Sequence, residues 1–143
     1  DAYKHDVIMA IRTQDLDTLR QFHAAGRPLK CSNKFGESLL HMACRKGFLG
    51  VTKVLVQEAK VPLAVCDDYG RTPLHDACWA HTTNFELIDL ILEECPDLLY
   101  IQDKRGSTPL SYLRRDKWTE WNTYLSNKSA DVLKPRVIPI KQL

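Results

Sequence analysis

The chain has 143 residues, of which 44% are hydrophobic and 27% charged, and its formal net charge is +2 at pH 7. The length predicts one domain, and the composition is that of an ordinary globular protein rather than an intrinsically disordered one. The small net charge argues against nucleic acid or an anionic membrane as an obligatory partner, and no apolar run approaches the roughly 18 residues of a membrane span.

Residues 3–26 are expected to form a first pair of helices within a first unit of residues 1–32. Asp15 can cap the second helix, in which Leu16, Leu19 and Phe22 recur every three residues, and Gly26 can end it. No turn motif precedes this pair, and its outer positions are charged. These features are typical of the end unit of a stack.

From residue 33 onward, a turn followed by a helix start occurs three times. In the best copy, residues 67–78, Asp67 and Gly70 indicate a tight turn, Thr72 is a natural N-cap, and Pro73 fits the first helical position. The glycines of the three copies, Gly36, Gly70 and Gly106, lie 34 and 36 residues apart. A turn-plus-helix element with this period predicts a repeat protein.

Residues 70–77, Gly-Arg-Thr-Pro-Leu-His-Asp-Ala, resemble the signature of the ankyrin repeat family, and the whole resemblance covers roughly residues 5–126. The copy before it departs from the signature at Ser38 and Leu39, and the copy after it at Ser111 and Leu113. The resemblance implies an all-α solenoid of stacked antiparallel helix pairs with short β-turn fingers. Its expected units are residues 1–32, 33–66, 67–102 and 103–127, followed by an extended C-terminal tail, residues 128–143.

Two histidines, His41 and His75, recur 34 residues apart, which could suggest a metal site. In the ankyrin family this histidine bonds to the neighbouring turn backbone and ties one repeat to the next. The resemblance therefore implies a structural role for both histidines, as it does for Thr72 and Pro73, and no metal is expected.

Five cysteines, Cys31, Cys44, Cys66, Cys78 and Cys95, occur without any C-x-x-C spacing. Buried free thiols in a reducing compartment account for them better than metal or redox chemistry. We therefore expect a cytoplasmic location, with the nucleus as a further option.

The connection between the two helices of the third unit, residues 79–85, is two residues longer than its counterpart in the second unit. His81 in this loop is either simply exposed or a partner contact. Thr83 and Glu86 have the spacing of a capping box, which predicts that the next helix starts at Thr83.

The last helix carries Trp118, Trp121, Tyr124 and Leu125, and aromatic rings can close the open end of a stack. From Lys128 the pattern stops. The tail can pack along the last helices, bind in trans as a strand, or be disordered, and the sequence leaves these options open.

Catalysis has no support in the sequence, which lacks G-x-S-x-G, H-E-x-x-H and P-loop motifs. Adjacent carboxylates such as Glu93 and Glu94 point to different faces of a helix, so they cannot converge on a substrate. We expect no enzymatic activity, no cofactor and no small-molecule substrate.

Regular stacking would align the fingertips and the first helices, and would gather exposed aromatic and cationic side chains on one surface. Aromatic residues and arginine are enriched at interface centres. The residues expected to contact a partner are Lys34, Phe35, Arg45, Lys46, Asp68, Tyr69, Arg71, Asp76, Trp79, Lys104, Arg105 and Arg115.

The resemblance thus implies a monomeric protein-interaction module with a concave surface for another protein or peptide. The alternatives are a regulatory or targeting segment of a larger enzyme and, less favoured, a nucleic-acid-binding surface.

Overall fold

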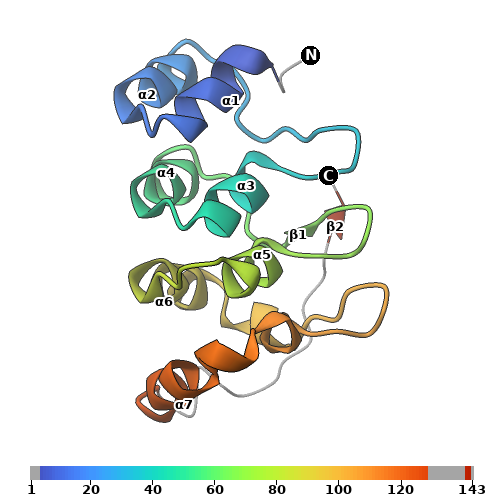
Figure 1. Ribbon diagram of the computed structural model, residues 1–143. Helices are drawn as coiled ribbons and strands as arrows, with labels where there is room; N and C mark the ends of the chain where they lie inside the picture. The colour runs from blue at the N-terminus through green and yellow to red at the C-terminus, as the bar shows by residue number, and fades with distance from the viewer. Residues whose placement is uncertain (1–3, 129–140, 143) are drawn as a thin grey trace.

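The computed structural model describes residues 4–128 and 141–142, and these residues form a stack of four helical layers (Figure 1). Each layer pairs two helices or helical turns, and the loops that enter the second, third and fourth layers project from the same side of the stack as fingers. The predicted all-α solenoid with turn fingers is confirmed.

The first layer consists of α1 (His5–Arg12) and α2 (Leu16–Ala24). As predicted, Asp15 caps α2, because its Oδ1 atom accepts a hydrogen bond from the Thr18 N–H at 3.1 Å. The buried apolar side chains of this layer are Val7, Ala10, Ile11 and Leu19.

The two central layers contribute most of the buried core. The second layer consists of α3 (Leu39–Lys46) and α4 (Leu49–Lys53), and α4 continues into a π-helical turn, η1 (Val54–Glu58). The third layer consists of α5 (Pro73–Trp79) and α6 (Phe85–Glu94). α3 packs directly against α5, so the first helices of successive layers form one continuous wall behind the fingers.

Both central layers start with a reciprocal cap. The Ser38 hydroxyl accepts from the His41 N–H at 3.2 Å, and the Thr72 hydroxyl accepts from the His75 N–H at 3.5 Å. In return, each histidine Nδ1 accepts from the N–H of its capping residue, at 3.1 and 3.0 Å. The same residues therefore begin the helix and set the orientation of the imidazole ring.

The start of α6 differs from the prediction. The N-cap is Asn84, not Thr83, and its Oδ1 atom accepts from the Leu87 N–H at 3.2 Å. Its Nδ2 atom also donates to the Gly47 carbonyl at 3.1 Å. Asn84 can thus cap the helix and bond to the preceding layer at once, which a threonine hydroxyl at position 83 does not do here.

The fourth layer starts with a short 3₁₀ turn instead of an α-helix. After η2 (Pro96–Tyr100) come the 3₁₀ turns η3 (Pro109–Tyr112) and η4 (Arg115–Lys117), and then α7 (Trp118–Ser126). The departures from the repeat signature at Ser111 and Leu113 coincide with this change.

Aromatic side chains close the end of the stack, but not all of the predicted ones do so. Trp121 is only 1% exposed and packs edge-on against Phe85, with ring centroids 5.3 Å apart, while Tyr124 stacks on Phe85 at 4.6 Å. Trp118 stays 51% exposed on the outside of α7.

A short parallel pairing joins β1 (Val65–Cys66) to β2 (Lys141–Gln142), with Val65 opposite Lys141. The predictions for residues 129–140 and 143 of the tail lie outside the described residues. Within the described part of the chain, no helix combines the length and apolar character needed to cross a membrane.

Candidate binding groove

The three fingers are closed by the same side-chain hydrogen bonds. In each finger, the Oδ1 atom of Asn33, Asp67 or Asp103 accepts from the backbone N–H groups two and four residues further on, at 2.9 to 3.0 Å. Because these bonds are local, the turn residues in the sequence are sufficient to form the finger. Two residues of each turn are left at its tip.

Backbone hydrogen bonds join one fingertip to the next. The Asp68 N–H donates to the Phe35 carbonyl at 2.9 Å, and the Lys104 N–H donates to the Tyr69 carbonyl at 3.0 Å. The tips therefore form a continuous row in which Phe35 is 45% and Tyr69 55% exposed. The Arg71 guanidinium lies 5.0 Å from the centre of the Tyr69 ring.

The two repeated histidines hold this row against the helices. His41 Nε2 donates to the Arg71 carbonyl at 2.7 Å, and His75 Nε2 donates to the Ser107 carbonyl at 2.9 Å. Each Nδ1 already accepts a backbone N–H, so each ring carries its proton on Nε2. Burial lowers the pKa of both histidines, which keeps them neutral.

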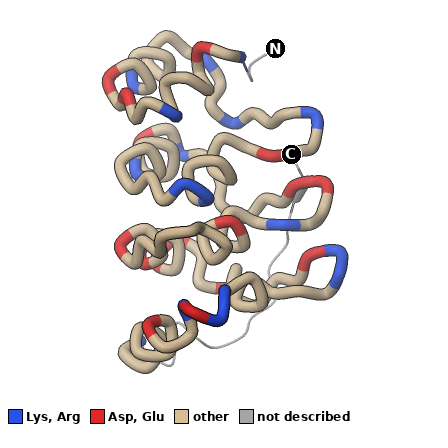
Figure 2. Tube along the Cα trace, in the orientation of Figure 1, with Lys and Arg blue, Asp and Glu red and all other residues tan. Residues whose placement is uncertain are grey.

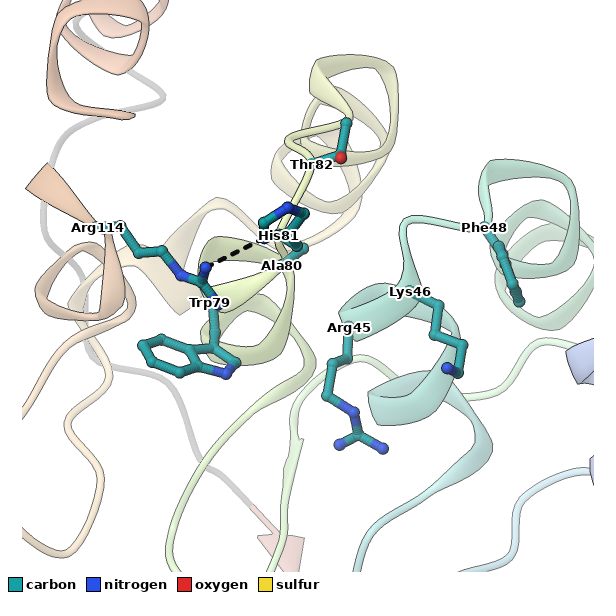
Figure 3. Close-up of a pocket in the computed structure, with 8 residues that line it drawn as sticks. All are labelled: Arg45, Lys46, Phe48, Trp79, Ala80, His81, Thr82 and Arg114. Atoms are coloured by element: carbon teal, nitrogen blue, oxygen red, sulfur yellow. Dashed lines mark hydrogen bonds between the residues drawn. The ribbon is translucent and has the colours of Figure 1, made fainter. Parts of the chain in front are cut away.

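Three adjoining hollows lie along the first helices, and the second and third of them are also lined by finger residues. The first, of about 460 Å³, is shown in Figure 3 and is lined by Arg45, Lys46, Phe48, Trp79, Ala80, His81, Thr82 and Arg114. The second, also of about 460 Å³, is lined by Arg71, Trp79, Arg105, Ser107, Ser111, Tyr112 and Leu113. The third, of about 260 Å³, is lined by Tyr69, Arg71, Asp103, Lys104, Arg105 and Tyr112.

Shared lining residues make the three hollows one surface, which we call the Trp79 groove. Trp79 belongs to the first and second hollows, and Arg71, Arg105 and Tyr112 belong to the second and third. The groove therefore runs from the last fingertip, past Trp79, to the helix α3.

Trp79 stands in the middle of the groove and is 48% exposed. The Arg114 guanidinium lies 4.8 Å from the centre of its ring, and the Tyr112 ring meets it edge-on at 6.5 Å. Arg114 is itself positioned by His81, whose Nδ1 atom is 3.1 Å from Arg114 Nη1 (Figure 3). The indole is thus held by two neighbours while nearly half of it remains open to a ligand.

Two of the arginines in the groove are neutralised by carboxylates from the protein. Arg45 Nη1 lies 2.7 Å from Glu37 Oε2 and 3.4 Å from Asp76 Oδ2. Arg71 Nε lies 2.9 Å from Asp67 Oδ2. Asp76 is 2% exposed, and its burial raises its pKa to about 7 even though Arg45 and Arg71 lower it.

The structure places the residues predicted to contact a partner in three environments. Those that line the groove are Arg45, Lys46, Tyr69, Arg71, Trp79, Lys104 and Arg105. Lys34, Phe35 and Asp68 lie along the fingertip row, and Asp76 is buried beneath Arg45. Arg115 is apart from them, with its guanidinium 5.6 Å from the Trp118 ring.

Arg114 occupies the groove position that repeat counting predicts for Arg115. The count assumes an α-helix in the fourth layer, but η3 ends at Tyr112 and the register then shifts by one residue. Tyr112, which lines two of the hollows, was also missed. The departures at Ser111 and Leu113 were the available signal that the regular register ends there.

Among residues 4–128, no group of three or more His, Cys, Asp or Glu side chains is arranged to hold a metal ion. Burial raises the pKa of the Cys44 and Cys78 thiols, so they stay protonated and weakly nucleophilic. Cations, aromatic rings and hydroxyl groups remain available to a ligand.

The helical layers define this chain as a repeat solenoid, and the Trp79 groove runs across it from the last fingertip to α3. The family description "Ankyrin repeats (3 copies)" matches residues 7–98, and the chain belongs to the ankyrin repeat family.

Among similar proteins, the "Putative ankyrin repeat protein YahD" of Escherichia coli is 28% identical over 116 residues, which are 79% of this chain and 57% of that protein. The "Putative glutaminase 2" of Caenorhabditis elegans is 37% identical over 71 residues, 50% of this chain and 12% of that protein. The human "SMC5-SMC6 complex localization factor protein 1" is 33% identical over 79 residues, 55% of this chain and 7% of that protein. The matched region thus spans less than two thirds of each relative.

Proposed function

We propose that this chain is a non-catalytic protein-interaction module that holds a partner protein or peptide in the Trp79 groove and along the fingertip row. Trp79 itself carries the proposal, because a large aromatic ring is left 48% exposed between two hollows and among cationic side chains. Tryptophan, tyrosine and arginine contribute most of the binding energy at protein interfaces. Ankyrin repeats in general are protein-interaction modules, which supports this function.

The mechanism is binding by a preformed surface. Local turn bonds and the two buried histidines already hold the fingers and the groove in place, so little conformational freedom is lost on binding. A single chain contains the whole groove, and we propose the monomer as the active unit. The free thiols of Cys31, Cys44 and Cys78 support a reducing compartment, the cytoplasm or the nucleus.

The test is a comparative capture from matched cell extract. The bait proteins are the wild type, a triple groove variant (Phe35→Ala/Tyr69→Ala/Arg105→Glu) and a triple control variant (Met9→Ala/Trp118→Ala/Arg12→Glu). The control makes the same kinds of change at exposed residues outside the groove. We expect a partner that is retained by the wild type and by the triple control variant but is lost by the triple groove variant. Equal retention by all three proteins would contradict the proposed site.

A second candidate function is that of a regulatory or targeting segment within a larger enzyme. The similarity to a region that makes up 12% of the "Putative glutaminase 2" of Caenorhabditis elegans favours it. The test of this second candidate is to examine the complete reading frame that contains this chain for a catalytic domain. A catalytic domain beside residues 1–143, with activity or location changed by their deletion, is the expected result, whereas a complete frame without such a domain would rule the candidate out.

A further inference from the structure

The charges around Trp79 are not balanced. Among the described residues, Lys46, Lys104, Arg105 and Arg114 take part in none of the ion pairs with a carboxylate. They contrast with Arg45 and Arg71, which lie against carboxylates of the protein. Within the described part of the chain, these four cationic groups therefore lack a carboxylate partner, although the Arg114 guanidinium also contacts Trp79 and His81.

Among the described residues that line the three hollows, Asp103 is the one carboxylate, and it forms no ion pair with these cations. Asp103 Oδ1 accepts the N–H groups of Arg105 and Ser107, both at 2.9 Å. Its Oδ2 atom accepts from the Tyr112 hydroxyl. Both oxygens thus take part in closing the last finger, and the four cations without a carboxylate partner outnumber this carboxylate along the groove.

The free cations lie on both sides of the exposed indole. Lys104 and Arg105 belong to the last fingertip, and Arg105 shares the second hollow with Trp79. Lys46 and Arg114 line the first hollow, where Figure 3 shows them on opposite sides of Trp79. This order, positive then aromatic then positive, is complementary to a chain with two acidic groups separated by an apolar side chain.

We propose that the ligand of the Trp79 groove is an acidic peptide segment, with Asp or Glu residues on both sides of an apolar or aromatic side chain that packs on Trp79. The inference rests on the proposed function and names the chemical class of the partner. Arg and Lys pair with carboxylates by charge-assisted hydrogen bonds, and the positive field speeds the encounter at low salt.

The distribution of charge favours a peptide over a nucleic acid. Acidic residues interrupt the basic ones along the fingers, as Figure 2 shows, and Asp68 stands in the fingertip row between Lys34 and Lys104. A phosphate backbone carries a negative charge at every nucleotide and would meet these carboxylates. A peptide can place its acidic residues only where the cations are.

The experiment selects ligands from random octapeptides displayed on phage, with wild-type protein as bait. The groove variant Arg105→Ala/Arg114→Ala and the control variant Arg12→Ala/Lys53→Ala, which removes the same charge from exposed positions elsewhere, are baits in parallel. We expect the wild type and the control to enrich sequences with acidic residues on both sides of an apolar one. The groove variant should not enrich them.

Fluorescence anisotropy then measures the affinity of the most enriched octapeptide. We expect it to fall at least tenfold in Trp79→Ala and in the groove variant, to stay within twofold in the control, and to weaken as salt is raised. Circular dichroism melts show whether each variant is folded, and Arg105→Lys should retain most of the binding.

Enrichment of neutral or basic octapeptides, equal enrichment on the groove variant, or no enrichment at all would overturn the proposed ligand class. Stronger binding of a random 20-nucleotide DNA than of the best octapeptide would also overturn it, in favour of nucleic acid. The capture experiment keeps the two proposals apart. If the capture experiment yields a partner that the triple groove variant loses, the proposed function stands even when the phage selection contradicts the acidic ligand class.

Discussion

At the residue scale, the most unusual group of the groove is the carboxyl group of Asp76. It lies on the first turn of α5 and is 2% exposed, and Arg45 is its nearest cation at 3.4 Å. Sequence alone suggests an exposed interface residue at this position. Packing of α3 against α5 buries the carboxyl group instead, and burial raises its pKa from 3.8 to about 7.

We predict that Asp76→Asn changes the pH dependence of stability. Between pH 3.8 and about 7 the folded wild type binds a proton at Asp76 that the unfolded chain releases, so its stability falls as pH rises through this window. Asparagine does not titrate. The free energy of unfolding of the variant should therefore rise relative to that of the wild type by up to ~1.4 kcal/mol per pH unit, and level off above pH 7.

Urea unfolding of both proteins at pH 5, 6, 7 and 8 measures this difference. All other titrating groups are shared, so their contributions largely cancel. A difference that stays constant across the range would show that Asp76 is already ionised in the folded protein at pH 5.

At the scale of the element, the fingers explain why their glycines cannot be replaced equally. Gly70 has a φ of +78°, and a Cβ atom on it would lie 2.9 Å from the backbone nitrogen of Lys104 in the next finger. Gly106 has nearly the same φ, +83°, but no atom lies within 4 Å of its Cβ position. Gly106 belongs to the last of the described fingers, so no further fingertip of the described chain packs against its Cβ position.

We predict that Gly70→Ala is more destabilising than Gly106→Ala. Both variants place a side chain in the left-handed region, which costs about 1–2 kcal/mol. Gly70→Ala must also push the next fingertip away, which adds about 1–3 kcal/mol of overpacking. Thermal or urea unfolding gives the two values, and Gly106→Ala serves as the control for backbone strain. Equal losses of stability in the two variants would mean that the neighbouring fingertip can move aside without an energetic cost.

The fourth layer shows how one element changes the site. Its first segment is the 3₁₀ turn η3 rather than an α-helix. η3 starts at Pro109, in register with Pro73 of α5, but it ends at Tyr112, and the register differs from the repeat pattern by one residue after that point. As a result Arg114, and not Arg115, contacts Trp79. Repeat counting locates the layer correctly but assigns the wrong arginine to the groove.

At the scale of the whole molecule, stability depends on how each layer covers the next. In a stack of repeats, each unit contacts only its neighbours, so an exposed end layer is weak unless it is closed. Trp121 provides this closure beneath Phe85 and Tyr124. Trp118, three residues earlier on α7, points outward and is 51% exposed.

We predict that Trp121→Ala lowers the free energy of unfolding by about 3–5 kcal/mol, whereas Trp118→Ala changes it by less than about 0.5 kcal/mol. Hydrogen exchange should show that Trp121→Ala reduces protection in α6 and α7 much more than in α1 and α2, because the layers interact only with their neighbours. A uniform loss of protection would indicate that the stack unfolds as one unit.

The amino-acid sequence is sufficient to identify the repeat, its period, the turn fingers and the capped helix starts. These features arise from bonds between residues at most a few positions apart, such as those of Asp67 with its own turn and of Thr72 with His75. Only the packed stack decides which side chains meet. The burial of Asp76, the entry of Arg114 instead of Arg115 into the groove, and the bond from the Asn84 side chain to the Gly47 carbonyl are contacts between layers. Residues 30 or more positions apart make those contacts, and no local pattern encodes their register.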